Sequence, residues 1–275
     1  MRLRRALTLG AAVLASVGGL LAGPAPAQAA PRAVTLASTI KLSNCSASLV
    51  RYPSSVSTDR AMMLTNGHCY EGGFIAAGQV LLNRASSRSG TLLNSSGGSL
   101  GTVRADRVLY ATMTGTDVTL YRLTSTFATL QSRYGVTALT LSSTRAAAGT
   151  SMSIPSSYWK RIWNCKVDTF VDTLREDQWT WRDSIRYDSA CDTIHGTSGS
   201  PIVDAGTGRI IGINNTGNDD GEMCTINNPC EVAADGTTRA YQGQSYGQQT
   251  YWFTTCLDAS RAIDLTISGC LLTKP

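Results

Sequence analysis

Several residue types and patterns are scarce in this 275-residue sequence, and each shortage argues against a class of protein. Only two histidines are present, His68 and His195, and no Cys-x-x-Cys pair occurs, so a structural zinc site has little support. No basic stripe with interleaved aromatic residues occurs, which argues against nucleic-acid binding. Charged residues make up 16% of the chain, below the usual share of about a quarter. Past the N-terminus no long apolar run occurs, so no later membrane span is expected.

The first 29 residues have the layout of a secretory signal peptide. Three arginines among the first five residues precede an apolar run, and the small-residue tripeptide Ala27-Gln28-Ala29 follows. We interpret 1–29 as a signal peptide and 30–275 as a secreted, extracellular protein; an uncleaved anchor and a twin-arginine signal are the alternatives. Cleavage would remove three arginines and no acids, lowering the formal net charge from +5 to +2. The basic character therefore comes largely from the signal.

The mature chain retains all of the cysteines. An even number of cysteines in an exported chain predicts disulfides rather than free thiols. The eight residues concerned are Cys45, Cys69, Cys165, Cys191, Cys224, Cys230, Cys256 and Cys270.

Strand signals dominate the rest of the sequence, and the predicted fold class is all-β. Short β-rich runs alternate with Gly, Ser, Asn and Asp clusters, the clearest hairpin being 201–203 and 209–213 around the turn 204–208. The Ser- and Gly-rich stretch 86–101 is interpreted as an exposed loop, and only 257–263 favours a short helix. A Thr- and Ala-rich stretch from about 124 to 150 separates two strand-rich halves, which fits two β-barrels side by side.

The segment HGTSGSPIVD, 195–204, holds two serines in a turn, Ser198 and Ser200. A serine hydroxyl is a poor nucleophile near neutral pH, so chemistry at either serine requires a neighbouring base. His195 lies on the same tight turn as Ser198, where it is better placed to line a pocket. His68, in LTNGHC at the end of a strand-like run, is the better candidate for the base.

Three motifs, which carry a histidine, an aspartate and a serine in that order along the chain, resemble those of the chymotrypsin-like (trypsin-like) serine peptidases. LTNGHC, with CSASLV upstream, is similar to the family's histidine region. The segment 105–123, ADRVLYATMTGTDVTLYRL, is similar to its aspartate region, and GTSGSP, 196–201, resembles its serine motif. The form SGSP, with Cys191-Asp192-Thr193 ahead of it, is closest to the secreted bacterial V8-like, or glutamyl-endopeptidase-like, branch.

The resemblance implies a fold and a set of roles. The fold would be two packed six-stranded antiparallel β-barrels with the active site between them: an N-terminal barrel at about 35–125, a linker at about 126–150 and a C-terminal barrel at about 151–275. Ser198 would be the nucleophile, His68 the general base, and Asp117 the residue that orients His68. The backbone N–H groups of Gly196 and Ser198 would form the oxyanion hole.

The resemblance also places the pocket for the residue before the cleaved bond. Its walls would come from Asp192, Thr193, His195, Asn214, Asn215, Thr216 and Gly217. Asp192 suggests a slight preference for Arg or Lys. Asn214, at the place where the glutamate-specific enzymes carry a histidine, argues against Glu.

For the disulfides, sequence neighbourhood and the resemblance together favour four pairs. These are Cys45–Cys69, Cys165–Cys191, Cys224–Cys230 and Cys256–Cys270, with Cys191–Cys224 as the main alternative.

The function implied is a secreted serine endopeptidase that acts as a monomer on proteins or peptides, without a cofactor or metal. No nucleic acid, and no membrane after signal cleavage, is expected as a partner. The sequence leaves open whether Asp219-Asp220-Gly221-Glu222 binds a calcium ion. The alternatives are a non-catalytic binding or adhesion protein on the same scaffold, and an esterase using the same three residues.

Overall fold

The structure is a computed structural model that describes residues 33–275. The signal peptide predicted for 1–29 lies outside the described residues. Strands make up nearly all of the regular secondary structure of the described chain, so the all-β fold class is confirmed. Among the described helices, none is long and apolar enough to cross a membrane.

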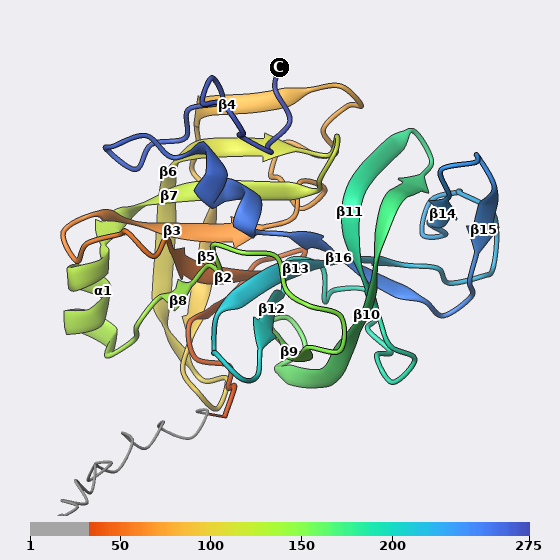
Figure 1. Cartoon of the computed structure of the whole chain (residues 1–275). Coiled ribbons are helices and arrows are strands. Elements are labelled where there is room, and N and C mark those ends of the chain that lie inside the picture. Colours follow the sequence, from red (N-terminus) through yellow and green to blue (C-terminus); the bar gives the residue numbers. More distant parts are fainter. Residues whose placement is uncertain (1–32) are drawn as a thin grey trace, which may run out of the picture. The chain divides into compact units, whose positions relative to one another are not determined.

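The first half of the chain closes into a six-stranded antiparallel barrel. In ring order the strands are β1–β5–β6–β7–β3–β2, and β1 pairs with β2 to close the ring (Figure 1). A further strand, β4, pairs with the long β6. The bounds are β1 Thr39–Lys41, β2 Ser46–Arg51, β3 Arg60–Thr65, β4 Val80–Ala85, β5 Ser89–Leu93, β6 Ser99–Thr112 and β7 Val118–Thr126.

The second half forms another closed ring, so the expected two-barrel architecture is present. Its six antiparallel strands run β11–β16–β13–β12–β9–β10, and β10 pairs with β11 to close it. The small strands β14 and β15 extend β10 to one side. The bounds are β9 Ser151–Ser156, β10 Arg161–Glu176, β11 Trp179–Tyr187, β12 Pro201–Asp204, β13 Ile210–Gly217, β14 Cys230–Val232, β15 Thr238–Ala240 and β16 Ser245–Gln249.

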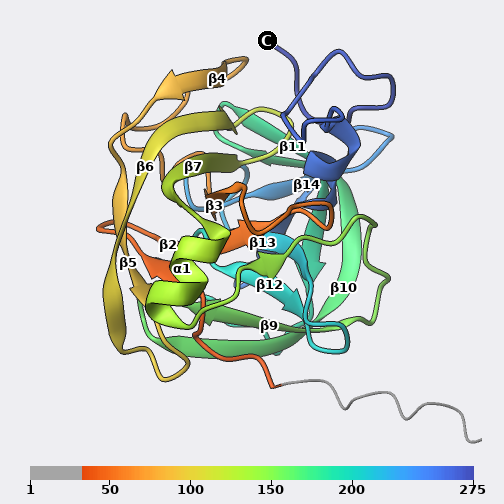
Figure 2. The ribbon, with the colours of Figure 1, turned by 90° about the vertical axis from the view of Figure 1, so that its left-hand side faces the viewer.

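The stretch between the barrels contains the one α-helix of the described chain, α1 (Phe127–Tyr134), which follows directly from β7 (Figure 2). The Thr126 side chain caps its start by accepting a hydrogen bond from the Thr129 N–H. Gly135 ends it in the left-handed region with φ 68°. Strand β8 (Leu139–Thr140) then pairs in parallel with β2.

Two local predictions are wrong. The stretch 86–101, expected to be an exposed loop, contains β5 and the start of β6, because Leu92 and Leu93 are buried in the barrel. The helix expected at 257–263 is absent; Leu257 and Ile263 form an isolated antiparallel bridge, and a 3₁₀ helix, η1 (Tyr251–Cys256), precedes them.

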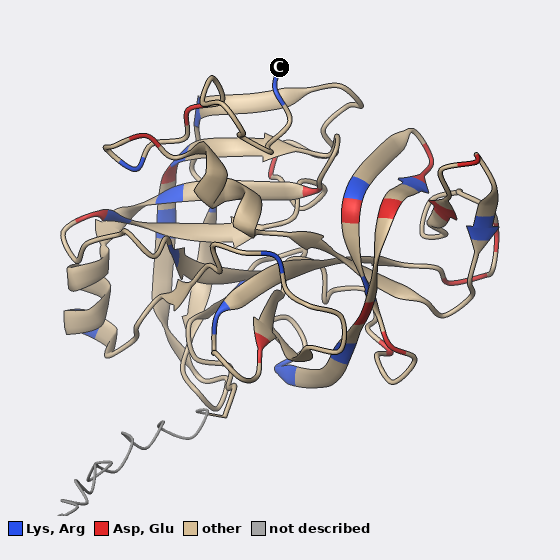
Figure 3. Cartoon of the chain, in the orientation of Figure 1, with Lys and Arg blue, Asp and Glu red and all other residues tan. Residues whose placement is uncertain are grey.

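Strand β11 and the chain around Ser46 tie the two barrels together. Indole N–H groups of β11 donate to first-barrel carbonyls: Trp179 to Ile75 at 2.9 Å and Trp181 to Met113 at 2.9 Å. Ser46, at the start of β2, donates its backbone N–H to the Ser198 carbonyl at 2.8 Å. These bonds fix residues of both barrels beside Ser198. In Figure 3, basic and acidic residues are interspersed along the ribbon of β10 and β11 rather than gathered in one stripe.

All four disulfides of the favoured pairing are present. They join Cys45 to Cys69, Cys165 to Cys191, Cys224 to Cys230 and Cys256 to Cys270. The alternative pairing Cys191–Cys224 is therefore wrong.

Candidate active site

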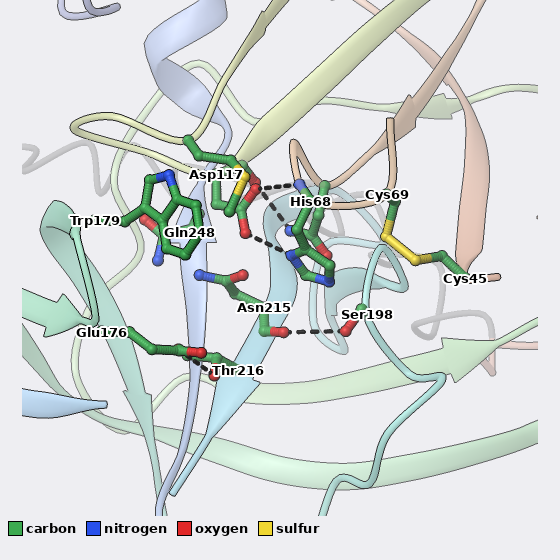
Figure 4. Close-up of polar contacts among 12 residues, drawn as sticks. Cys45, His68, Cys69, Asp117, Glu176, Trp179, Ser198, Asn215, Thr216 and Gln248 are labelled. Atoms are coloured by element: carbon green, nitrogen blue, oxygen red, sulfur yellow. Dashed lines mark hydrogen bonds and ion pairs between the residues drawn. A yellow bond between two sulfur atoms is a disulfide. The ribbon is translucent and has the colours of Figure 1, made fainter. Parts of the chain in front are cut away.

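His68 and Asp117 come together because β3 and β7 are antiparallel neighbours. His68 follows the end of β3 and Asp117 precedes the start of β7, and the pairing of Thr65 with Thr119 brings those two ends side by side. His68 Nδ1 lies 2.6 Å from Asp117 Oδ2, and the His68 backbone N–H donates to Asp117 Oδ1 at 2.9 Å (Figure 4). Both carboxylate oxygens are thus directed at one residue.

The local backbone leaves no room for another arrangement. A Cβ at Gly67 would lie 2.2 Å from the Thr112 carbonyl oxygen and 2.7 Å from Asp117 Oδ1, so only glycine fits there. Asn66 donates its side-chain N–H to the Asp117 carbonyl at 2.9 Å. The Cys45–Cys69 disulfide fixes the residue after His68. The ring orientation is therefore set by hydrogen bonds, sterics and a covalent bond together.

Burial makes this pair electrostatically strong. Asp117 is fully buried, while the His68 side chain is 21% exposed. Burial alone lowers the pKa of His68, but the charge of Asp117, its hydrogen bond and the charge of Glu176 outweigh that effect, so the pKa is raised above its ordinary value. Nδ1–H held toward a carboxylate leaves Nε2 as the free proton acceptor.

Ser198 lies in a tight turn between Gly196 and Gly199, both in the left-handed region with φ 87° and 81°. A Cβ at Gly199 would lie 2.0 Å from the Ser46 carbonyl oxygen. The Ser198 hydroxyl donates to the Asn215 carbonyl at 3.2 Å (Figure 4). Within residues 33–275, neither the Gly196 nor the Ser198 backbone N–H has a hydrogen-bond acceptor. Two N–H groups without acceptors therefore belong to residues that line the same groove as the hydroxyl.

One groove of about 370 Å³ brings these groups together. His68 and Asp117 reach it from the first barrel, and Gly196 and Ser198 from the second. The groove is also lined by six of the residues expected in the substrate pocket: Thr193, His195, Asn214, Asn215, Thr216 and Gly217. The Asn214 side chain already has hydrogen-bond partners within the protein. It accepts from the Tyr187 hydroxyl and donates to the Thr197 hydroxyl, each at 3.0 Å.

Asp192 is a correction to the predicted pocket. Its side chain is 78% exposed, faces Arg161 at 3.9 Å, and does not line the groove. An exposed carboxylate keeps its hydration, which burial in the groove would remove, and the backbone carbonyl of Asp192 accepts a hydrogen bond from the Trp163 indole. A preference for Arg or Lys directly before the cleaved bond consequently loses its main support.

His195 lies at the rim of the groove and pairs with a different acid. Its Nε2 lies 2.7 Å from Asp219 Oδ2, and the two side chains are 71% and 44% exposed. The position fits the predicted pocket wall. The sequence suggested Asp219 only as part of a possible calcium site, and its pairing with His195 is a feature that sequence reasoning missed.

Glu176 is the largest omission from the predicted site. It ends β10, is only 7% exposed and lines the groove. Its two oxygens accept from the Thr216 hydroxyl at 2.6 Å and from the Asn227 N–H at 2.9 Å. Burial raises the pKa of this carboxyl, and these hydrogen bonds offset part of the rise. No family motif contains it, and a Glu at a strand end carries no recognisable signal.

Aromatic side chains were missed for the same reason. Phe74 contacts His68 edge to face at 6.1 Å between ring centroids, and Trp179 contacts Phe74 at 5.4 Å. Together they extend the wall of the groove away from Ser198.

Metal ligation has one geometric candidate among the described residues, the group Cys45, His68 and Cys69. The two sulfur atoms are bonded to each other, so they offer no thiolate. This group therefore does not fit a metal ion.

Comparison with known proteins agrees with the motifs. The family model described as "Trypsin-like peptidase domain" matches residues 54–213. Among curated protein sequences, none matches this chain significantly.

Solved structures similar to this chain include several bacterial proteases. The MamO protease domain from Magnetospirillum magneticum is 13% identical, with a TM-score of 0.49, and the match covers 82% of this chain and 97% of that one. The Nocardiopsis protease is 18% identical, with a TM-score of 0.43, covering 78% and 90%. The Cellulomonas bogoriensis chymotrypsin is 14% identical, with a TM-score of 0.42, covering 78% and 90%.

The family model covers more than half of the chain, including His68, Asp117 and Ser198. This chain belongs to the trypsin-like peptidase domain family.

Proposed function

We propose that this chain is a secreted serine endopeptidase that cleaves peptide bonds through Ser198, His68 and Asp117. The observation that carries the proposal is the pairing of His68 with the buried Asp117, in one groove with the Ser198 hydroxyl and two free backbone N–H groups. The four disulfides and the signal-like N-terminal sequence support an extracytoplasmic location.

The acylation step begins with the Ser198 hydroxyl. It turns about its Cα–Cβ bond from the Asn215 carbonyl toward His68 Nε2, and Oγ attacks the substrate carbonyl carbon as its proton passes to Nε2. The carbonyl oxygen takes up the negative charge between the N–H groups of Gly196 and Ser198; one such donor is worth about 10²–10³ in rate. The C–N bond then breaks as His68 returns the proton to the departing amine.

Deacylation repeats these steps with water. His68 Nε2 takes a proton from water, the resulting hydroxide attacks the Ser198 ester, and the proton returns to Oγ as the acid product leaves. Asp117 keeps its proton count throughout and stabilises the imidazolium that forms in each half-reaction.

Strand β13 offers a place for the substrate backbone. Strand β12 pairs with β13 only as far as Ile213, so Asn215, Thr216 and Gly217 keep one edge free. An extended peptide added to this edge would present a carbonyl to Ser198. Its N–H would compete for the Asn215 carbonyl that holds the Ser198 hydroxyl, which would release the hydroxyl toward His68.

The finer assignment, to the V8-like branch, rests on the sequence form SGSP and on Cys191-Asp192-Thr193. We do not extend this assignment to a preference for Glu before the cleaved bond. Asn214 is buried, and its amide oxygen and nitrogen each already have a hydrogen-bond partner within the protein.

Substitution of the two neighbouring serines tests the proposal. Ser198→Ala should remove nearly all peptide cleavage, whereas Ser200→Ala, a buried hydroxyl of the same turn with no hydrogen-bond partner, should keep most of it. The measurement is digestion of a proteome-derived peptide mixture, with the cleaved bonds identified by mass spectrometry. A correctly folded wild-type protein that cleaves no peptide would contradict the proposal. Ester hydrolysis without peptide cleavage would instead establish the esterase alternative.

A further inference from the structure

Glu176 is a buried carboxylate without a cationic partner. It forms no ion pair with any lysine or arginine among residues 33–275. Its hydrogen bonds come from a hydroxyl and a backbone N–H only. A buried carboxylate is costly unless it is paired. Glu176 therefore lines the groove with a carboxyl group that no lysine or arginine among the described residues pairs with.

The surroundings of Glu176 suit a cation on an apolar stem. Glu176 and Trp179 are directly opposed partners at the end of the β10–β11 hairpin, so their side chains share one face. Figure 4 shows both on the same side of Asn215, away from the Cys45–Cys69 disulfide. Phe74 extends this wall toward His68. Aromatic faces beside a carboxylate bind the methylene stem and the charged end of Lys or Arg.

The charge of the whole groove points the same way. Its lining includes the carboxylates of Asp117, Glu176 and Asp219 and no lysine or arginine. Asp117 is paired with His68 and Asp219 with His195. Glu176 alone of the three offers its charge to a ligand.

The geometry of an added strand determines which substrate side chain would face Glu176. In a peptide added to the free edge of β13, successive side chains point to opposite faces. If the final side chain before the cleaved bond enters the pocket around Thr193 and Gly217, the penultimate side chain would face the other way. It would then lie over His68 and along the Phe74–Trp179 wall toward Glu176.

We propose that Glu176 makes this groove selective for substrates with lysine or arginine as the penultimate residue before the cleaved bond. The inference rests on the proposed peptidase function and names part of its substrate class. It is independent of the pocket for the final residue, from which Asp192 is excluded.

Glu176→Gln is the variant that tests this selectivity. Gln has the shape of Glu, and its Oε1 can still accept from the Asn227 N–H while its amide N–H donates to the Thr216 hydroxyl. Asp192→Asn is the matched control, because it also removes one carboxylate charge but lies outside the groove. Ser198→Ala gives the background.

The measurement has two parts. Digestion of a peptide mixture by wild type identifies the best-cleaved sequence; kcat/KM is then compared for two synthetic versions of it, with Lys or Met as the penultimate residue. A charge-assisted contact corresponds to a preference of roughly tenfold or more for Lys. At a pH above the acid limb of activity, we expect this preference in wild type and Asp192→Asn, and its loss in Glu176→Gln through slower cleavage of the Lys peptide alone.

Thermal unfolding separates selectivity from a structural role. Because burial raises the pKa of Glu176, its carboxyl favours the fold most below its ordinary pKa, and that contribution is lost as pH rises through the raised one. Glu176→Gln should therefore unfold at neutral pH at the same temperature as wild type or higher.

The possible failures are distinguishable. Ser198-dependent cleavage with equal rates for Lys and Met, or a Lys preference that survives in Glu176→Gln, would overturn the inference and leave the peptidase proposal standing. Absence of any Ser198-dependent cleavage would overturn both. Equal loss of both peptides together with a lower unfolding temperature would assign Glu176 a purely structural role.

Discussion

The two histidines of this chain each pair with an aspartate at nearly the same distance, yet the two pairs differ in burial and in the contacts that support them. His68 and Asp117 are 2.6 Å apart, with the acid fully buried; His195 and Asp219 are 2.7 Å apart, with side chains 71% and 44% exposed. Exposed ion pairs contribute little because water screens them and their side chains stay mobile. Distance alone therefore does not make a histidine a base.

The supporting contacts explain the difference. Asp117 receives a second hydrogen bond, from the His68 backbone, and Gly67 allows no side chain between them. The structure gives Asp219 no comparable bond from the His195 backbone. A ring held on both sides is pre-organised for proton transfer, whereas a ring at the rim is suited to contacting substrate.

Substitution of the two histidines is the strongest way to break this comparison. His68→Ala should lower kcat by about 10⁴–10⁶, because the nucleophile loses its base. His195→Ala should change kcat/KM by less than about tenfold, since one exposed contact is worth at most about 1 kcal/mol. Both are measured on one peptide identified from the wild-type digestion. A larger loss in His195→Ala would exchange the roles assigned to the two regions.

The two aspartates give the next largest contrast. Asp117→Asn should lower kcat by about 10⁴, because an amide no longer holds the productive tautomer or stabilises the imidazolium. Asp219→Asn, the same chemical change at the exposed pair, should act mainly on KM and by only a few fold. Equal effects of the two substitutions on kcat would contradict the distinction between the pairs.

These expectations also show how far the sequence alone reaches. His68, Asp117 and Ser198 were predicted from motifs, and the structure brings all three to one groove. The pairing of β3 with β7 places His68 beside Asp117. Sequence proximity misled at Asp192, where the bond from Trp163 to its carbonyl accompanies an outward-facing side chain. Glu176 could not be found, since only the folded β10–β11 hairpin places it beside His68.

For the fold, too, elements set by short-range patterns were predicted and elements set by long-range pairing were not. The alternating strands and the hairpin at 201–213 follow from short-range patterns. The strand at 89–93 does not, because its Ser and Gly are typical of loops and only long-range pairing with β1 and β6 makes it a strand. Helix α1 had signals that were overlooked, with Thr126 at its start and Gly135 at its end.

The pH dependence of activity tests the role of one atom, His68 Nε2. His68 acts as a base only when Nε2 is unprotonated, and its pKa is raised. Activity should therefore increase with pH along an acid limb above the ordinary imidazole value of about 6.5. Glu176→Gln removes one of the charges that raise this pKa and should move the limb to lower pH. A limb that stays in place in this variant would show that Glu176 does not act on His68.

Asp192→Asn should have the smallest effect. Its carboxylate is exposed and lies outside the groove, so kcat/KM and the choice of the final residue before the cleaved bond should match wild type within about twofold, as for an exposed charge. The measurement is the cleavage profile of the peptide mixture. Specific loss of cleavage after Arg and Lys would return Asp192 to the pocket.

Labelling with a fluorophosphonate, followed by intact-mass and peptide mapping, tests the central claim most directly. The reagent bonds covalently to a serine only where a base and an oxyanion site activate it. We predict one adduct per folded chain, located on Ser198, formed in His195→Ala as in wild type and abolished in His68→Ala. Folded wild-type protein that carries no adduct, or carries it on Ser200, would contradict the account.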